Sequence, residues 1–196
     1  MSENRVRLNN VRLSFISLDK ARDYQNDGKF KYFATLLMPK DGPEHKKCLQ
    51  AMKAAASAKW GADKAVAMVK AVLASGAQKC ALQDGEIKAA THEGFDGMMA
   101  LKASARPNTP PKLLDNVAGS DGKALTLPQD TPKIYAGCYA NCVVEFWASS
   151  NNGNGIYCSL AGVQFAKDGD AFGGGRAADA DEFEATAAPE VKDDFA

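Results

Sequence analysis

The 196-residue sequence predicts a mainly β fold, a small antiparallel barrel of about five strands with an inserted helical hairpin and an acidic C-terminal tail. Alternating apolar and polar residues recur along residues 5–167, as they do in half-buried strands. Residues 43–76 instead repeat apolar residues at helical spacing, and residues from 173 onward show no periodicity. We therefore predict a domain over residues 1–172 and a flexible tail over residues 173–196.

The composition, with 45% hydrophobic and 24% charged residues, provides for a hydrophobic core and excludes wholesale disorder. No apolar run approaches the roughly 18 residues that a membrane span requires. Residues 1–5 lack the apolar stretch of a signal peptide. We therefore expect a cytoplasmic protein that does not associate with membranes.

The first two strands are predicted over residues 5–15 and 29–39. Consecutive asparagines at Asn9 and Asn10 predict a bulge that switches the alternation of the first strand. The residues predicted to face the core are Val6, Leu8, Val11, Leu13 and Phe15 in the first strand and Phe30, Tyr32, Ala34, Leu36 and Met38 in the second.

The helical hairpin is predicted to begin near Pro43, which suits a first helical turn. Gly61 separates its two helices and Gly76 ends the second. The second helix has an apolar stripe that consists of Val66, Val69, Val72 and Leu73.

Three more strands are predicted over residues 98–106, 135–148 and 156–167. The Pro- and Gly-rich stretch 107–122 is predicted to be a loop, and residues 149–155 form a strong hairpin signal. Among small antiparallel barrels, the five-stranded OB-fold is a common platform for nucleic acid. The periodicity by itself does not exclude another barrel or a sandwich.

Charge is distributed unevenly along the chain, although its 24 basic and 24 acidic residues cancel. Residues 177–196 hold seven acidic residues and Lys192, a net charge of −6, which leaves +6 on the rest. The predicted solvent faces of the strands supply cations and aromatic rings: Arg5, Arg7, Arg12, Lys29, Lys31, Phe33, Lys102, Arg106, Tyr139, Trp147 and Tyr157. Cations follow phosphates while rings stack on unpaired bases, so this mixture predicts sequence-independent binding of single-stranded nucleic acid.

Two other classes of function stay open on the residues alone. Four acids, Asp84, Glu86, Glu93 and Asp96, are a candidate Mg²⁺ site of a nuclease, although a solvated glycine-rich turn explains them better. The basic face also suits an acidic protein partner. The five cysteines include no C-x-x-C pair, so we expect reduced, buried thiols, and we expect no metal, cofactor or catalytic residue.

A set of landmarks spread over about residues 5–175 resembles a family of bacteriophage single-stranded-DNA-binding proteins, formerly a domain of unknown function. These landmarks are residues 32–40, Asp84-Gly85, Gly97, residues 104–107, residues 137–141, Gly155-Ile156, residues 160–164 and Asp168-Gly169. The resemblance implies an OB-fold, sequence-tolerant binding of single-stranded DNA, and a role in phage replication or recombination in the bacterial host cytoplasm. It leaves self-association on DNA open.

The acidic tail ends in Asp193, Asp194 and Phe195, followed by Ala196. A flexible chain of about 20 residues reaches roughly 25 Å, farther than the radius of gyration of about 16 Å expected for the body. We therefore expect the tail to compete with nucleic acid for the basic surface. This end is similar to the tails through which single-strand binders recruit replication proteins, which implies a partner-binding role for the three residues.

Overall fold

One curved sheet organises residues 2–23 and 26–172, the part of the chain that this computed structural model describes. The elements in chain order are β1 (Arg5–Arg22), β2 (Lys31–Pro39), α1 (Pro43–Trp60), α2 (Ala62–Ala74), β3 (Leu82–Asp84), α3 (Glu86–Ala89), β4 (Met98–Ala105), β5 (Lys112–Ala118), β6 (Ala124–Thr126), β7 (Tyr139–Ser149) and β8 (Gly155–Lys167).

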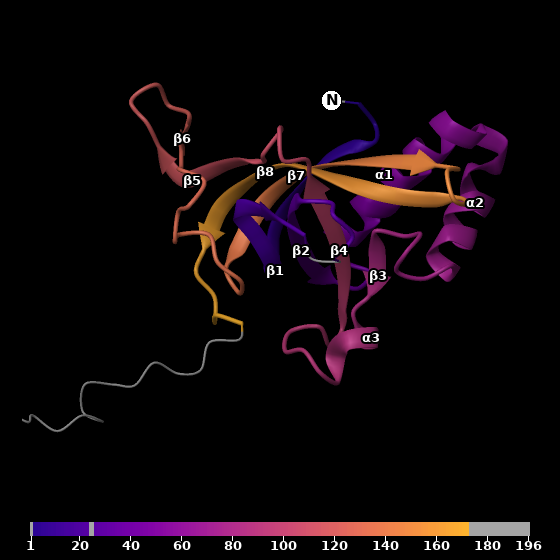
Figure 1. Cartoon of the computed structure of the whole chain (residues 1–196), viewed down its shortest axis with the longest axis horizontal. Coiled ribbons are helices and arrows are strands. Elements are labelled where there is room, and N and C mark those ends of the chain that lie inside the picture. The colour runs from indigo at the N-terminus through magenta and orange to yellow at the C-terminus, as the bar shows by residue number, and fades with distance from the viewer. Residues whose placement is uncertain (1, 24–25, 173–196) are drawn as a thin grey trace, which may run out of the picture.

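Five of these strands close into a barrel. The strand order is β3-β4-β2-β1-β7-β8-β5-β6, and β4 also pairs with β8 in parallel through Ser104 and Ser159. Strands β1, β2, β4, β7 and β8 thus form a closed ring in which all other neighbours are antiparallel. The predicted five-stranded OB-type barrel is confirmed (Figure 1).

Strand β1 is long because irregularities in its pairing let it bend around the barrel. Its first half pairs with β7 and its second half with β2, with register shifts after Leu8, Ser14 and Ser17. Asn10 has a φ of 51°, in agreement with the predicted bulge. The prediction that Phe15 faces the core is wrong. Phe15 has a φ of 44° at the second bulge and packs against a smaller cluster, formed by Leu37, Phe95 and Ala100.

The helical hairpin agrees with its prediction and covers one side of the barrel (Figure 1). Helix α1 packs against β7 and β1, with Met52 and Ala56 fully buried, and Gly61 with a φ of 93° ends it. Helix α2 packs mainly on α1, and only part of its stripe is covered. Val69 and Val72 are buried, whereas Val66 is 48% exposed.

Several predicted segment boundaries are corrected by the structure. Strand β1 continues to Arg22, past its predicted end at residue 15, and β7 begins at Tyr139, after its predicted start at residue 135. Strand β2 begins at Lys31, so Lys29 and Phe30 precede it, and Phe30 is 57% exposed rather than part of the core. The predicted loop 107–122 contains β5, which pairs in parallel with β8 and antiparallel with β6. These two short strands project from the barrel as an arm (Figure 1).

The main core lies inside the barrel and under α1. Leu8, Leu13, Leu36, Leu101 and Phe146 are fully buried there. All the cysteines are free and buried, as predicted, and burial raises the pKa of the Cys48 thiol to about 12. Within the described residues, no helix is long and apolar enough to cross a membrane.

Candidate nucleic-acid interface

The outer surface of β2 and β4 gathers several of the predicted interface residues. We call it the β2–β4 face and define it by Lys31, Phe33, Thr35, Lys102, Ser104 and Arg106. Phe33 pairs with Ser104 and Thr35 with Lys102, while the alternate residues Leu36 and Leu101 point into the core. The second and third strands of an OB barrel, here β2 and β4, provide the usual face for oligonucleotides.

Cations on this face lack acidic partners within the described residues. Lys31, Lys102 and Arg106 are exposed and form no ion pair there. Burial of its amine lowers the pKa of Lys102, and the nearby ammonium of Lys88 lowers it further. An uncompensated, partly desolvated cation gains free energy when an anion such as a phosphate approaches it.

An aromatic pair lies beside this face on the β7–β8 hairpin. Trp147 and Tyr157 are directly opposite in the register, with ring centroids 4.7 Å apart and planes tilted by 34°. Trp147 is 47% exposed. One short chain segment separates Tyr157 from β4: Cys80 bridges to Ile156, and the carbonyl of Ala81 accepts the Lys102 N–H at 2.9 Å.

Arginines on the first half of β1 lie elsewhere and already have partners. Arg5 forms an ion pair with Glu145 on β7 at 3.1 Å. Arg7 donates to the Gln164 side chain on β8 at 3.2 Å. We call this outer surface the β1–β7 face, where Arg5 and Arg7 contact β7 and β8 rather than residues of the β2–β4 face.

Arg12 and Tyr139 belong to a third arrangement, the C-terminal anchor, which we define as residues 168–172 with the side chains that hold them. The Arg12 guanidinium carbon lies 4.1 Å from the Phe172 ring centroid, and Arg12 donates to the carbonyl of Asp170 at 2.9 Å. The Lys167 ammonium lies 4.6 Å from the Tyr139 ring centroid. Phe172 donates its N–H to Ala136 at 2.9 Å.

The remaining predicted interface residues are not gathered by the described structure. Lys29 lies in the loop before β2 and pairs with Asp27 at 3.1 Å. Asp193, Asp194 and Phe195 lie outside the described residues.

The four acids of the candidate Mg²⁺ site do not converge. Asp84 pairs with Lys40 at 2.6 Å, and this contact lowers the pKa of Asp84. Glu86 accepts the Gly97 N–H at 2.8 Å. No group of three or more His, Cys, Asp or Glu side chains suited to a metal ion occurs in the described part of the chain.

Sequence reasoning missed a pocket at the lower end of the β2–β4 face. One part of its lining comes from β2 and β4 and consists of Thr35, Ala100 and Lys102. The other part comes from α3 and the loop that follows and includes Ile87, Lys88 and Phe95. The one available signal was Ile87, an isoleucine among charged and glycine residues, which is 73% exposed.

The fold and the face together define a class: an OB-type barrel whose strands β2 and β4 carry exposed cations on their outer surface. The family model described as the ssDNA-binding protein of Enterobacter phage Enc34 matches residues 4–196. The chain belongs to this family, and the resemblance drawn from the landmarks is confirmed. Putative protein p50 of Acyrthosiphon pisum secondary endosymbiont phage 1 is 35% identical over 181 residues, which cover 92% of each chain.

Solved structures agree with this membership. The single-stranded DNA-binding protein from bacteriophage Enc34, in complex with ssDNA, matches at a TM-score of 0.67 with 27% identity. The match covers 87% of this chain and 90% of that one. The single-stranded DNA-binding protein gp2.5 of bacteriophage T7, at 16% identity and a TM-score of 0.51, covers 97% of this chain and 96% of its own and supports the fold alone. The family and these neighbours are DNA-binding proteins rather than enzymes, which disfavours the nuclease hypothesis.

Proposed function

We propose that this chain binds single-stranded DNA without regard to sequence and coats it during phage DNA replication or recombination. The observation that carries the proposal is the β2–β4 face, where Lys31, Lys102 and Arg106 form no ion pair with a described residue. Membership in a family described as ssDNA-binding supports it independently.

Phosphates are bound by the cations and bases by the rings. On single strands, each phosphate that is neutralised contributes a slope of about −0.7 to the dependence of log K on log salt. Phe33 lies on the β2–β4 face, and Trp147 and Tyr157 lie beside it. A base stacked on such a ring contributes about 1–3 kcal/mol whatever its identity, which makes the binding sequence-tolerant.

The acidic tail competes with DNA for this face and recruits replication or recombination proteins when DNA displaces it. The C-terminal anchor supports the first part, since Phe172 packs on Leu37, Phe95 and Ala100, at the lower end of the β2–β4 face. Residues 177–196, with a net charge of −6, follow Phe172 in the sequence after four intervening residues. Partner binding by Asp193, Asp194 and Phe195 is proposed from the sequence alone.

Fluorescence titration tests this function. We expect oligo-dT to quench tryptophan emission and to bind with a steep salt dependence, while duplex DNA of equal charge quenches weakly. If the chain instead binds an acidic protein partner, neither DNA should quench tryptophan emission, because no base stacks on the ring. If the chain is a nuclease, it should shorten a labelled strand in the presence of Mg²⁺. Absence of oligo-dT binding at low salt would refute the proposal.

A further inference from the structure

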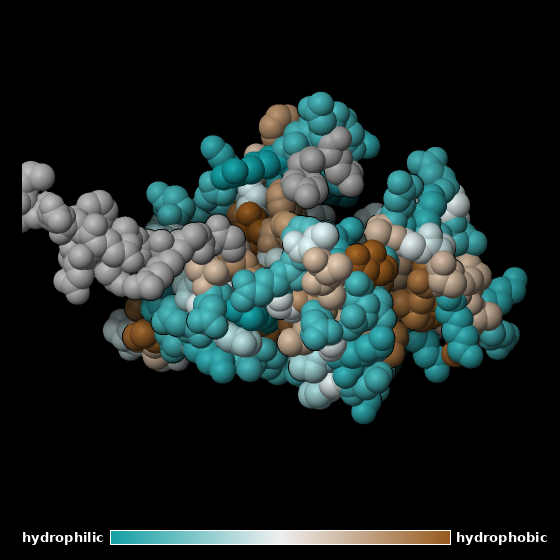
Figure 2. All heavy atoms as spheres, turned by 90° about the horizontal axis from the view of Figure 1, so that it is seen from below, coloured by the Kyte–Doolittle hydropathy of each residue, from teal (hydrophilic) through white to brown (hydrophobic). Residues whose placement is uncertain are grey.

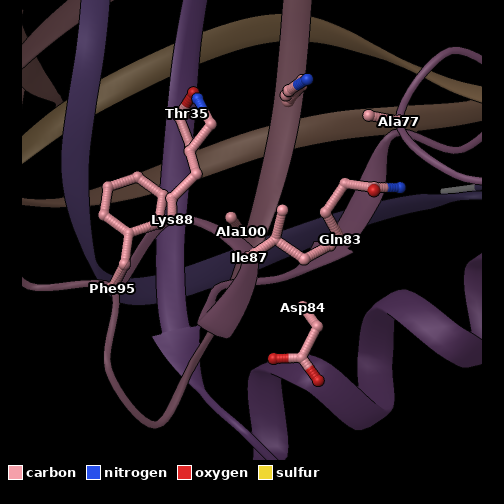
Figure 3. A pocket seen from close by; sticks show the side chains of 9 residues that line it. Thr35, Ala77, Gln83, Asp84, Ile87, Lys88, Phe95 and Ala100 are labelled. Carbon is pink, nitrogen blue, oxygen red and sulfur yellow. The ribbon is translucent and has the colours of Figure 1, made fainter. Parts of the chain in front are cut away.

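A shallow, mostly apolar pocket opens on the β2–β4 face. It has a volume of about 340 Å³ including its open mouth and is lined by Thr35, Ala77, Gln83, Asp84, Ile87, Lys88, Phe95, Ala100 and Lys102. Figure 3 shows Phe95 and Lys88 on one side of the pocket, Gln83 and Ala77 on the other, and Ile87 and Ala100 between them.

The walls of this pocket are mostly apolar. Phe95 and Ala100 are buried and belong to the smaller hydrophobic cluster, whereas Ile87 is 73% exposed at the rim. Seen from below in Figure 2, the molecule is largely hydrophilic, and hydrophobic residues come to the surface in several separate places. An exposed isoleucine beside a recess leaves apolar surface in water, and covering that surface with a flat ring is favourable.

Two cations flank the apolar walls. The Lys88 ammonium lies 4.5 Å from the Phe15 ring centroid, and neither Lys88 nor Lys102 forms an ion pair within the described residues. Asp84, the acid among the lining residues, is paired with Lys40 instead. The net character of the pocket is therefore an apolar recess between two positive charges.

Polar groups of the lining are few. The Gln83 amide donates to the carbonyls of Cys80 and Leu82, both at 3.0 Å, which fixes it at one wall. The Thr35 hydroxyl is another polar group of the wall. A recess with so few donors and acceptors favours planar rings in general over one base in particular.

We propose that this pocket receives one nucleobase of the bound strand, with the base against Ile87 at the rim and the adjoining phosphates at Lys88 and Lys102. The inference rests on the proposed function and specifies where a base is held. We infer a nucleobase as the occupant for two reasons. The pocket is continuous with the β2–β4 face, because Thr35 and Lys102 belong to both, and cations lie at its rim.

Two substitutions in the full chain test the subsite. Ile87→Ala removes the apolar rim, and Ala77→Phe fills the recess from an exposed position. We expect each to weaken oligo-dT binding about 5- to 10-fold, the loss of one stacked base at the lower end of its range. Val66→Ala and Ala71→Phe, at exposed positions of α2, are matched controls and should bind as the wild type does.

An abasic deoxyribose-phosphate strand of equal length separates base from backbone contacts. We expect Ile87→Ala to leave abasic binding and the salt slope unchanged, because Ile87 contacts no phosphate. Equal weakening for both strands would overturn the subsite, as would wild-type oligo-dT affinity in both variants. Tighter binding by Ala77→Phe would mean that the pocket holds a competitor such as the tail, which also overturns it. If the wild type itself fails to bind oligo-dT, the proposed function falls as well.

Discussion

Two outer surfaces of the same barrel carry similar numbers of cations but differ in what those cations contact. On the β1–β7 face, Arg5 and Arg7 donate to Glu145 and Gln164. On the β2–β4 face, Lys102 and Arg106 have no acidic partner among the described residues. A cation that is already paired offers less to a phosphate, since binding must first break the existing contact. The proposed DNA-binding face is therefore distinguished by cations that have no acidic partner in the described part of the chain, rather than by the number of its cations.

Paired charge removal on the two faces should give the largest difference. We expect Lys102→Gln/Arg106→Gln to lose about 15-fold in oligo-dT affinity at about 0.15 M salt, because each neutralised phosphate contributes roughly a factor of four there. The salt slope should fall in magnitude by about 1.4. The matched variant Arg5→Gln/Arg7→Gln removes the same charge and should lose less than about two-fold. Equal losses in the two variants would show that both faces bind.

Removal of the exposed ring beside the β2–β4 face should weaken binding about 10-fold. Trp147→Ala deletes one stacking platform, and a stacked base contributes about 1–3 kcal/mol. The chain has two tryptophans, and the Trp60 indole donates to Ser150 at 2.9 Å. Trp147→Phe should therefore abolish quenching by oligo-dT, while Trp60→Phe should preserve it. Quenching that survives in Trp147→Phe contradicts the placement of bases at the β7–β8 hairpin.

Truncation after residue 176 should tighten oligo-dT binding about five-fold at low salt, because it removes a competing charge of −6. The gain should shrink as salt screens the tail from the cations. A control chain in which the tail acids are replaced by Asn and Gln should behave like the truncation. Unchanged affinity in both chains contradicts tail competition.

Alkaline pH should produce the smallest effect. The pKa of Lys102 is lowered by burial and then by Lys88, so its charge is lost at lower pH than that of an ordinary lysine. Affinity should therefore begin to fall below the ordinary lysine pKa of 10.5, by up to about four-fold, which corresponds to one phosphate contact. The free energy of unfolding should change in the opposite direction to the affinity. Because the pKa of Lys102 is lower in the folded state than in the unfolded state, its contribution to stability increases as pH rises. Lys102→Arg should flatten the affinity profile, and a flat wild-type profile contradicts the role of Lys102.

Local patterns predicted much of the barrel. Alternation placed Lys102 outward and Leu101 inward, and the same rule assigned the faces of β7 and β8. Helical spacing and Gly61 gave the hairpin its bounds. These features depend on residues close in sequence, which is why a single sequence contains them.

Features that depend on distant residues could not be read in this way. The second bulge of β1 turned Phe15 outward, and nothing in its immediate sequence marks a φ of 44°. The hydrogen-bond partners of the Arg5 and Arg12 side chains are at least 125 positions away in the sequence. The pocket likewise joins Thr35, Ile87 and Lys102 from three segments. The sequence thus predicted which cations point outward. Only the tertiary structure shows which of them already have a partner.

Photo-crosslinking tests the central claim most directly. A 5-bromodeoxyuridine-substituted oligo-dT is bound to the full chain, irradiated and mapped by peptide mass spectrometry. We expect adducts on β2, on residues 85–97 and on the Trp147–Tyr157 pair, with none on the first half of β1. Adducts concentrated around Arg5, Arg7 and Gln164 would contradict the assignment of the β2–β4 face.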